Sequence, residues 1–332
     1  MTDPVAPTPE SISHAVSVLR GSGLVAFPTE TVYGLGADAT DDVAVRRIFE
    51  VKGRPSDHPL IVHLADASQL AQWVIEVGSR AQVLADAFWP GPLTLLMERS
   101  SSVSSIVTGG RSTIGLRVPD HPVALELLHS FGGAIAAPSA NRFGRVSPTS
   151  AEHVSADLAD DVDVILDGGP CRVGVESTIV DLTGDRPIVL RVGGVPIDRL
   201  EEVLGEEVTV VVAAEPADGG ARAPGMLEAH YAPSAKVVLA TEHDLTDVLL
   251  QELRVAEGPV GVLAPSTQAV LPEGVIELEP AGGADEYAAV LYSRLRQADR
   301  LGLEVLVCVP PPRVGLGLAV VDRLRRAAAS TR

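Results

Sequence analysis

A stretch near residue 205 divides this sequence of 332 residues into two parts with different patterns. From about 205 to 233 the chain is rich in Ala, Gly and Pro without hydrophobic periodicity, which is typical of a linker. On both sides, short apolar runs alternate with helical patterns, so each part predicts an α/β domain with its own core. We therefore predict a large domain over 8–204, a linker over 205–233 and a small domain over 234–332.

The large domain has many unevenly spaced apolar runs. A doubly wound sheet needs regular alternation of strand and helix, so we predict a mixed twisted sheet with flanking helices instead. Strands are predicted at 24–27, 59–64, 92–98, 113–118, 133–139 and 162–169, with a hairpin-like pair of strands in 176–193. The first residues, MTDPVAPTPES, lack the basic and apolar regions of a signal peptide and are expected to be a disordered lead-in.

The small domain has a simpler pattern. Strands at 236–240, 260–264, 275–279 and 304–309 alternate with helices at about 244–256, 284–302 and 315–329. This alternation predicts a small parallel α/β domain with Rossmann-like connections. Its glycines do not form the GxGxxG pattern, so no dinucleotide site is implied.

Charge and cysteine content restrict the function classes. The formal net charge is −18, which argues against tight general binding to nucleic acid. Cys171 and Cys308 lie far apart and outside any metal-ligand spacing, as expected for reduced thiols in a cytoplasmic protein. No apolar run approaches the roughly 20 residues that a membrane span needs, so no membrane partner is expected.

Polar residues follow the predicted strand 24–27, in the stretch PTETVYGLGADA. One interpretation is a tight turn in which Gly34 and Gly36 permit positive φ, and Thr29 and Thr31 are ordinary loop hydroxyls. The other is a ligand site, because open α/β sheets bind ligands where strands end. The stretch alone does not decide between them.

A cationic cluster follows in KGRPSDHP, which contains Lys52, Arg54 and His58. Such a cluster is often a solvated helix end. Two prolines stiffen it, however, and a fixed Lys/Arg pair suits polyphosphate, which Arg can grip through two oxygens. Lys52 is also one of only two lysines, the other being Lys236.

Arg117 lies on an apolar strand, and a buried arginine needs an anionic partner from the protein or from a ligand. Further polar groups follow other strands: Ser139, Asn141 and Ser147 after one, and Ser177 and Arg191 within the predicted strand pair. His63 is also on a predicted strand, where a lone histidine is more often structural.

No P-loop, GxSxG elbow, metal-ligand spacing or catalytic carboxylate pair is present in the sequence. A site built from Lys, Arg, Ser, Thr and Asn without a nucleophile suits phosphoryl or nucleotidyl transfer. There the protein positions groups and stabilises charge, and Mg²⁺ carried by ATP shares this task.

In order along the chain, PTETVYGLGADA, KGRPSDHPLIVH, WPGPLTLLM, TIGLRVPDHP, APSAN, SPT and GVESTIVDL resemble the motifs of the YrdC family. With the linker APGMLEAHYAP and the small second domain, the sequence resembles the long form of that family over about residues 10–330. The resemblance implies a nucleotidyltransferase that converts L-threonine, bicarbonate and ATP to threonylcarbamoyl-adenylate and pyrophosphate. It also implies a partner transferase complex that passes the threonylcarbamoyl group to tRNA.

The resemblance also assigns residues. Around threonine it places Thr31, His63, Arg117 (paired with the carboxylate), Ser177 and the backbone of Ala137. Around ATP it places Lys52 and Arg54 as the main phosphate cations, with His58, Thr113, Ser139, Asn141, Ser147, Arg191 and, from the linker, Tyr231. A tyrosine reaching back from the linker suggests that this segment is a lid. No role follows for Glu30.

Two alternatives remain open. An RNA-binding or ribosome-associated module of the same fold is disfavoured by the net charge of −18. A carbamoyl-transfer domain, as in hydrogenase-maturation proteins, would be accompanied by zinc-finger-like and acylphosphatase-like modules that are not seen in this sequence.

Overall fold

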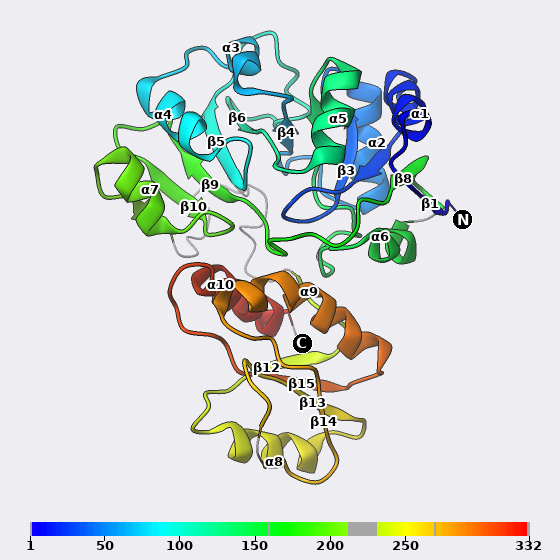
Figure 1. Cartoon of the computed structure of the whole chain (residues 1–332), viewed down its shortest axis with the longest axis vertical. Helices are drawn as coiled ribbons and strands as arrows, with labels where there is room; N and C mark the ends of the chain where they lie inside the picture. The colour runs from blue at the N-terminus through cyan, green and yellow to red at the C-terminus, as the bar shows by residue number, and fades with distance from the viewer. Residues whose placement is uncertain (1, 159, 212–230, 269, 331–332) are drawn as a thin grey trace. The chain divides into compact units, whose positions relative to one another are not determined.

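The computed structural model describes residues 2–158, 160–211, 231–268 and 270–330. They form two compact units (Figure 1). The first contains the described residues up to 211 except for two short loops, and the second contains those loops, 144–146 and 173–175, and the described residues from 231 onward. The predicted lid falls mostly on residues 212–230, which lie outside the described residues.

The first unit is built on one mixed sheet, as predicted. Its described strands follow one another across the sheet in the order β1 (Pro4–Val5), β8 (Val164–Leu166), β2 (Val25–Phe27), β3 (Gly34–Asp38), β7 (Ile135–Ala136), β4 (Ile61–His63), β6 (Thr113–Arg117), β5 (Leu93–Glu98), β9 (Thr178–Asp181), β10 (Ile188–Arg191) and β11 (Thr209–Val210). The predicted strand pair in 176–193 is present, with β9 antiparallel to β10.

Helices cover this sheet on both faces (Figure 1). They are α1 (Pro9–Arg20), α2 (Asp42–Lys52), α3 (Leu70–Trp73), which follows a 3-10 turn at Ala67–Gln69, α4 (Ser79–Phe88), α5 (Pro122–Phe131), α6 (Ala151–Leu158) and α7 (Ile197–Leu204). Their ends follow the expected local chemistry. In α2, Asp41 caps the first turn, and Gly53 ends the helix in the left-handed conformation that glycine adopts without strain.

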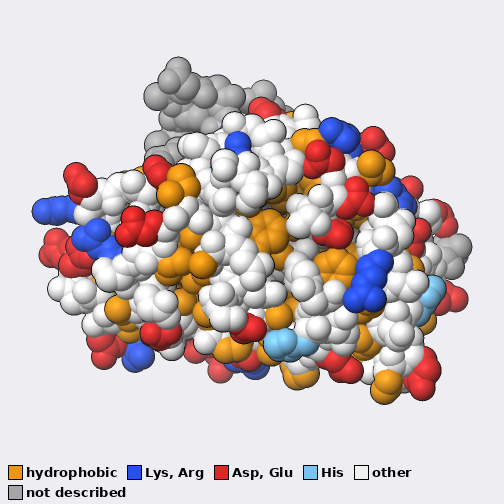
Figure 2. All heavy atoms as spheres, turned by 90° about the horizontal axis from the view of Figure 1, so that it is seen from above, with side chains coloured by type: hydrophobic (Ala, Val, Ile, Leu, Met, Phe, Trp, Pro, Cys, Tyr) orange, Lys and Arg blue, Asp and Glu red, His pale blue; other side chains and the backbone are white. Residues whose placement is uncertain are grey.

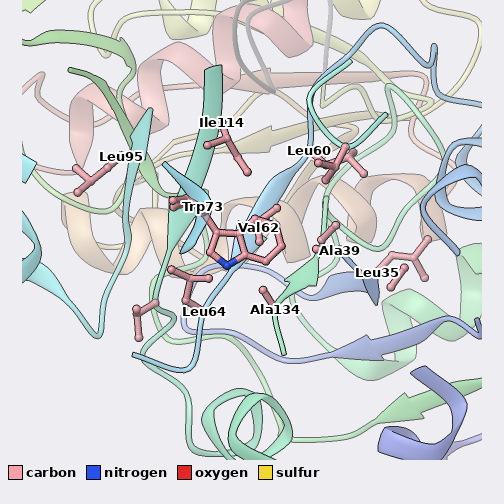
Figure 3. Packing of buried hydrophobic residues seen from close by; sticks show 14 of the residues in the cluster. Leu35, Ala39, Leu60, Val62, Leu64, Trp73, Leu95, Ile114 and Ala134 are labelled. Atoms are coloured by element: carbon pink, nitrogen blue, oxygen red, sulfur yellow. The ribbon is translucent and has the colours of Figure 1, made fainter. Parts of the chain in front are cut away.

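Two apolar clusters lie on opposite faces of the sheet because strand residues alternate in direction. On β2, Ala26 belongs to the main core with α2, whereas Val25 and Phe27 pack with α1 and α5. Figure 3 shows part of the main core, where Val62 and Leu64 lie around Trp73. The central strands thus bury one face completely in the main core.

The other face of the central strands carries small and polar residues next to a smaller apolar cluster of Ile61, Leu96, Ile179 and Leu190. Leu116 and Val118 on either side of Arg117 belong to the main core, so Arg117 is directed to the opposite face. The same alternation places Gly36, His63, Thr94 and Ser177 on that face, which we call the polar face. It extends over the adjacent strands β3, β7, β4, β6, β5 and β9.

Of the two interpretations of PTETVYGLGADA, the tight turn is wrong for the glycines, because Gly34–Asp38 form the strand β3. Neither Gly34 nor Gly36 has positive φ. A Cβ atom on Gly36 would lie 2.8 Å from Ile135 Cγ2 and 2.8 Å from Phe27 Cε1. Crowding by neighbouring side chains, not turn conformation, therefore requires a glycine there.

The expected disordered lead-in is also wrong. Pro4 and Val5 form β1, which pairs with β8 at the edge of the sheet. The Asp167 N–H donates to the Val5 carbonyl at 2.8 Å, and Thr2 Oγ1 donates to the Val162 carbonyl at 2.8 Å. The edge of β8 offers unpaired backbone groups, and this short segment satisfies them.

The second unit contains the predicted parallel sheet, in the order β12 (Lys236–Leu239), β15 (Val305–Cys308), β13 (Val260–Leu263) and β14 (Val275–Glu277). Its helices are α8 (Leu245–Val255), α9 (Ala284–Arg300) and α10 (Gly317–Ala329). Both cysteines of the chain are free and buried. No helix in the described residues is long and apolar enough to cross a membrane.

Candidate active site

Arg117 is the most deeply buried cation of the polar face, with a side chain that is 4% exposed. Its Nη2 lies 2.7 Å from Glu30 Oε1, and the Glu30 side chain is 1% exposed. Arg117 Nε donates to the Gly91 carbonyl at 3.2 Å, and Nη1 donates to Thr31 Oγ1 at 3.0 Å. The anionic partner that a buried arginine requires is thus supplied, at least in part, by the protein itself.

The Thr29 and Thr31 hydroxyl groups next to Arg117 form a chain of hydrogen bonds in which each donor can be assigned. Thr29 Oγ1 donates its one proton to the Val32 carbonyl at 2.7 Å. The 2.8 Å contact between the two hydroxyls must then run from Thr31 to Thr29. Since Arg117 donates to Thr31 as well, the Thr31 hydroxyl can only accept from a ligand.

His63 lies beside Arg117, because β4 and β6 pair with His63 opposite Arg117. Burial, and secondly the Arg117 guanidinium, lower the pKa of His63 to about 3, so the imidazole is neutral at physiological pH. Its ring packs edge-on against Phe27, with centroids 5.9 Å apart. His63 Nδ1 is buried and has no hydrogen-bond partner among the described residues.

Ser177, Thr94 and Arg191 form a second group on the polar face. Ser177 Oγ and Thr94 Oγ1 are 2.8 Å apart. Arg191 donates through Nη2 to Ser177 Oγ at 3.0 Å and through Nε to the Ser177 carbonyl at 3.0 Å. Arg191 therefore holds both the backbone and the hydroxyl of the residue that was expected to contact threonine.

Lys52 joins the end of α2 to the loop after β7. Its Nζ donates to the Ser139 carbonyl at 2.6 Å, the Asn141 carbonyl at 2.5 Å and Asn141 Oδ1 at 3.3 Å. Burial, and next the Arg54 guanidinium, lower the pKa of Lys52. These oxygens act in the opposite direction, because only the ammonium form has a proton for each of them. A direct phosphate contact would have to displace one of these bonds.

Arg54 and His58 lie in the loop after α2, around an aromatic ring. The Arg54 guanidinium carbon is 5.7 Å from the centroid of Phe143, and the His58 ring is 5.5 Å from the same centroid. Arg54 Nη2 donates to the Pro59 carbonyl at 2.9 Å. Burial and the Arg54 charge lower the pKa of His58. Arg54 and His58, two of the predicted nucleotide contacts, are thus brought together at Phe143.

The remaining predicted residues take different positions. Ser147 Oγ donates to Glu176 Oε1 at 2.8 Å, and both side chains are buried. Thr113 begins β6 and is half-buried, and the Ala137 N–H donates to the Ile61 carbonyl at 2.9 Å. Tyr231 belongs to the second unit, where its ring stacks on Tyr292 at 5.7 Å. Its expected contact with ATP stays a prediction.

Sequence reasoning missed four side chains at these positions: Glu30, Thr94, Phe143 and Glu176. For Thr94 a signal existed, because it interrupts the leucines Leu93, Leu95 and Leu96 of the predicted strand at 92–98. Glu176 could have been noticed because it precedes Ser177. Glu30 and Phe143 gave no such signal, since their partners are distant in sequence.

The donors of the site suit anions better than metals. Among the described residues, no group of three or more His, Cys, Asp or Glu side chains could hold a metal ion. The site offers buried Lys52, Arg54, Arg117 and Arg191, with neutral hydroxyl and amide groups between them. Such a set can neutralise and orient negatively charged oxygens.

Comparisons with known proteins agree with this arrangement. The Sua5/yciO/yrdC family model, described as Telomere recombination, matches residues 17–193. A second model, described as Threonylcarbamoyl-AMP synthase, C-terminal domain, matches residues 195–329. The two models together span both units.

Individual relatives match over nearly their full length. The threonylcarbamoyl-AMP synthase of Pyrococcus abyssi is 44% identical, with 95% of this chain and 93% of that protein covered. The one of Bacillus subtilis is 40% identical, with 99% and 96% covered. The crystal structure of P. abyssi Sua5 complexed with L-threonine has a TM-score of 0.89 at 42% identity, with 96% and 94% covered. The chain therefore belongs to the Sua5/YrdC family, in the two-domain form that it shares with these threonylcarbamoyl-AMP synthases.

Proposed function

We propose that this protein is an L-threonylcarbamoyladenylate synthase, which converts L-threonine, bicarbonate and ATP to threonylcarbamoyl-AMP and pyrophosphate. The observation that carries this proposal is the polar face. It brings Thr31, His63, Arg117 and Ser177 together from four separate segments of the chain, and the buried cation Arg191 holds Ser177 in this group. Relatives that share the fold over nearly the whole chain have this activity by name, and one was crystallised with L-threonine.

The threonine subsite is proposed at Arg117. A substrate carboxylate would accept from the guanidinium, and Thr31 Oγ1 would accept from an N–H or O–H of the amino acid, because its own proton is used by Thr29. His63 is neutral and adds no charge. Ser177, fixed by Arg191, and the Ala137 backbone complete the subsite.

The nucleotide subsite is proposed around Arg54 and the loop after β7. Arg54 and Arg191 would neutralise the phosphates, and Lys52 would hold Ser139 and Asn141 in place to contact the nucleotide. His58, Thr113 and Ser147 are the further candidates for nucleotide contacts. Mg²⁺ is proposed to bind through the ATP phosphates and water, since it usually keeps few protein ligands.

The reaction needs no protein nucleophile. The threonine nitrogen, once deprotonated, attacks the carbon of bicarbonate or CO₂, and an N–C bond forms. From the ammonium form and bicarbonate, the products are the carbamate, one water molecule and one proton. A carbamate oxygen then attacks the α-phosphorus, and the bond to the β-phosphate oxygen breaks to release pyrophosphate. The protein orients these groups and stabilises the developing charge.

The product is a reactive mixed anhydride, which would be passed to a transferase complex that modifies tRNA. We propose a cytoplasmic location, where that complex and tRNA would be found. A separate complex is expected to contact tRNA, because a protein with a net charge of −18 is poorly suited to bind tRNA itself.

The test is pyrophosphate release from Mg-ATP by the full-length protein. We expect release only when both L-threonine and bicarbonate are present, and a mass matching threonylcarbamoyl-AMP in the products. Omission of each substrate in turn is the control. Release that does not depend on threonine would overturn the proposal.

A further inference from the structure

We propose that Glu30 is a substrate-binding residue, whose carboxylate is the counter-ion for the ammonium group of the amino acid. Arg117 would take the carboxylate of the same molecule. The inference rests on the proposed function for the identity of the substrate. It adds that the site recognises the zwitterion, through a buried pair of opposite charges.

The first observation is the geometry of the pair. Arg117 Nη2 and Glu30 Oε1 are 2.7 Å apart, but neither makes a hydrogen bond of good geometry with a described residue. Glu30 Oε2 likewise has no hydrogen-bond partner among the described residues. A buried polar group without a hydrogen bond destabilises the folded state, and a charged group does so more strongly. The pair thus neutralises its charge internally and leaves its hydrogen-bonding capacity unused.

The second observation is charge balance. The Glu30 and Arg117 side chains are 1% and 4% exposed, so the pair is held away from water. A free carboxylic acid added here would bring a second negative charge to a guanidinium that is already neutralised. A zwitterion brings both signs and leaves the buried site neutral, which avoids an unpaired buried charge.

The third observation is that the neighbouring groups are hydrogen-bond acceptors. Around Glu30 and Arg117 the structure offers acceptors: the two Glu30 oxygens and the Thr31 hydroxyl, whose proton is given to Thr29. An ammonium group is a donor only, with three protons. Its donors therefore match the acceptors that these side chains leave open.

A simpler role for Glu30 would be to orient Arg117 without touching the substrate. The two roles differ in a measurable way. If Glu30 only orients Arg117, replacing Glu30 weakens the binding of every ligand that has a carboxylate by the same factor. If Glu30 binds the ammonium group, the loss is confined to ligands that have one.

The experiment compares two ligands on two proteins by calorimetry. The ligands are L-threonine and 3-hydroxybutanoate, which has the same carboxylate and hydroxyl but no amine. The proteins are the full-length chain and Glu30→Gln, which keeps the shape and removes the charge. A matched control is Glu252→Gln in the second unit, because Glu252 is also a buried carboxylate paired with a cation, Lys236.

We expect Glu30→Gln to raise the Kd of L-threonine by about 10- to 100-fold, which corresponds to the loss of one charge-assisted hydrogen bond. The Kd of 3-hydroxybutanoate should change much less. Glu252→Gln should bind both ligands like the unmodified protein. Equal weakening of both ligands by Glu30→Gln, or no weakening of either, would overturn the inference while leaving the proposed function intact.

The unmodified protein gives an independent arm should Glu30→Gln fold poorly. It should bind L-threonine at least about 10-fold more tightly than 3-hydroxybutanoate. Equal affinity for the two ligands would overturn the role of Glu30 without any variant. Failure to bind threonine at all would remove the proposed function and this inference together.

Discussion

At the scale of single residues, four buried cations determine how the loops of the site are held. Arg117, Lys52, Arg54 and Arg191 are all buried, and each has oxygen partners within the protein. Desolvation of such groups is costly, so they remain charged only where those oxygens are fixed in place. The cations that would bind substrate thus also hold together the loops whose oxygens accept their hydrogen bonds.

Lys52 illustrates this double role. In Lys52→Met the carbonyls of Ser139 and Asn141 lose a buried donor, so we expect a loss of about 2–4 kcal/mol in the free energy of unfolding. We also expect pyrophosphate release to fall at least about 100-fold, since a displaced loop misplaces the reacting groups. Urea unfolding and the turnover assay measure these effects.

The other lysine of the chain is the control for this prediction. Lys236 Nζ lies 2.9 Å from Glu252, and its side chain is 45% exposed. Lys236→Met leaves the buried carboxylate of Glu252 without its cation, so it should lower stability too, but it should leave turnover unchanged because this pair lies within the second unit. A Lys52→Met variant with the same turnover as Lys236→Met would show that Lys52 does not hold the loop.

His63 makes the stability of the first unit depend on pH. Its pKa is about 3 in the folded protein, against an ordinary value near 6.5, so only the unfolded chain takes up a proton between these values. The free energy of unfolding should fall as pH drops from about 6.5, by up to about 1.4 kcal/mol per pH unit. Above pH 7 this contribution is complete and constant.

His63→Phe, which cannot titrate, should remove this part of the pH dependence. The measurement is urea unfolding of both proteins at pH 7 and pH 5. We expect the difference between the two pH values to be smaller in the variant. The same difference in both proteins would mean that His63 is accessible to protons in the folded state.

At the scale of secondary structure, alternation along the strands decides what the site contains. Each central strand buries one face in the main core, part of which Figure 3 shows. The next residue of the strand faces the polar face, so apolar and functional positions interleave. Where this face is crowded, side chains must be small. That constraint explains the glycines of β3 better than any turn conformation does.

Gly36→Ala tests this crowding. The new Cβ would lie 2.8 Å from both Ile135 Cγ2 and Phe27 Cε1, so we expect a loss of about 1–3 kcal/mol in stability. Gly184 is a suitable control, because its Cβ would have no neighbour closer than 3.9 Å and its φ is not positive. Thermal unfolding should show a lower Tm for Gly36→Ala than for Gly184→Ala. Equal Tm values would contradict the packing argument.

Patterns in the sequence predicted most strands and helices, because apolar periodicity reports directly on burial. They failed for β3, since local propensity treats Gly34 and Gly36 as turn residues and says nothing of the side chains packed against them. Glu30 shows the same limit at the site. Its ion-pair partner, Arg117, is adjacent only after β4, β6 and β7 have assembled, and no local pattern records that contact.

At the scale of the whole molecule, net charge separates a small-molecule enzyme from an RNA-binding module. The chain has a net charge of −18 and only two lysines. On the face shown in Figure 2, the described residues present acidic side chains scattered among fewer basic ones. A long polyanion would meet repulsion over such a surface, whereas ATP needs only the few cations of the site.

We therefore expect no tight binding of tRNA by this protein alone. Filter binding with labelled tRNA should show no retained complex at about 150 mM salt, and little gain on lowering the salt to about 50 mM. A basic tRNA-binding protein measured in parallel is the control. Tight binding under these conditions, without nucleotide turnover, would favour the RNA-binding alternative.

The spread of the polar face over adjacent strands has a consequence for how the protein responds to its ligands. Residues from Thr31 to Arg191 reach this face only when β3, β7, β4, β6, β5, β9 and β10 are all paired, so no fragment of the sheet retains the complete site. Any molecule that binds there selects the fully assembled sheet. By mass action, substrate at about 100 times its Kd would add about 2.7 kcal/mol to the free energy of unfolding. The substrate concentration thus affects the fraction of enzyme that is folded as well as the rate of turnover.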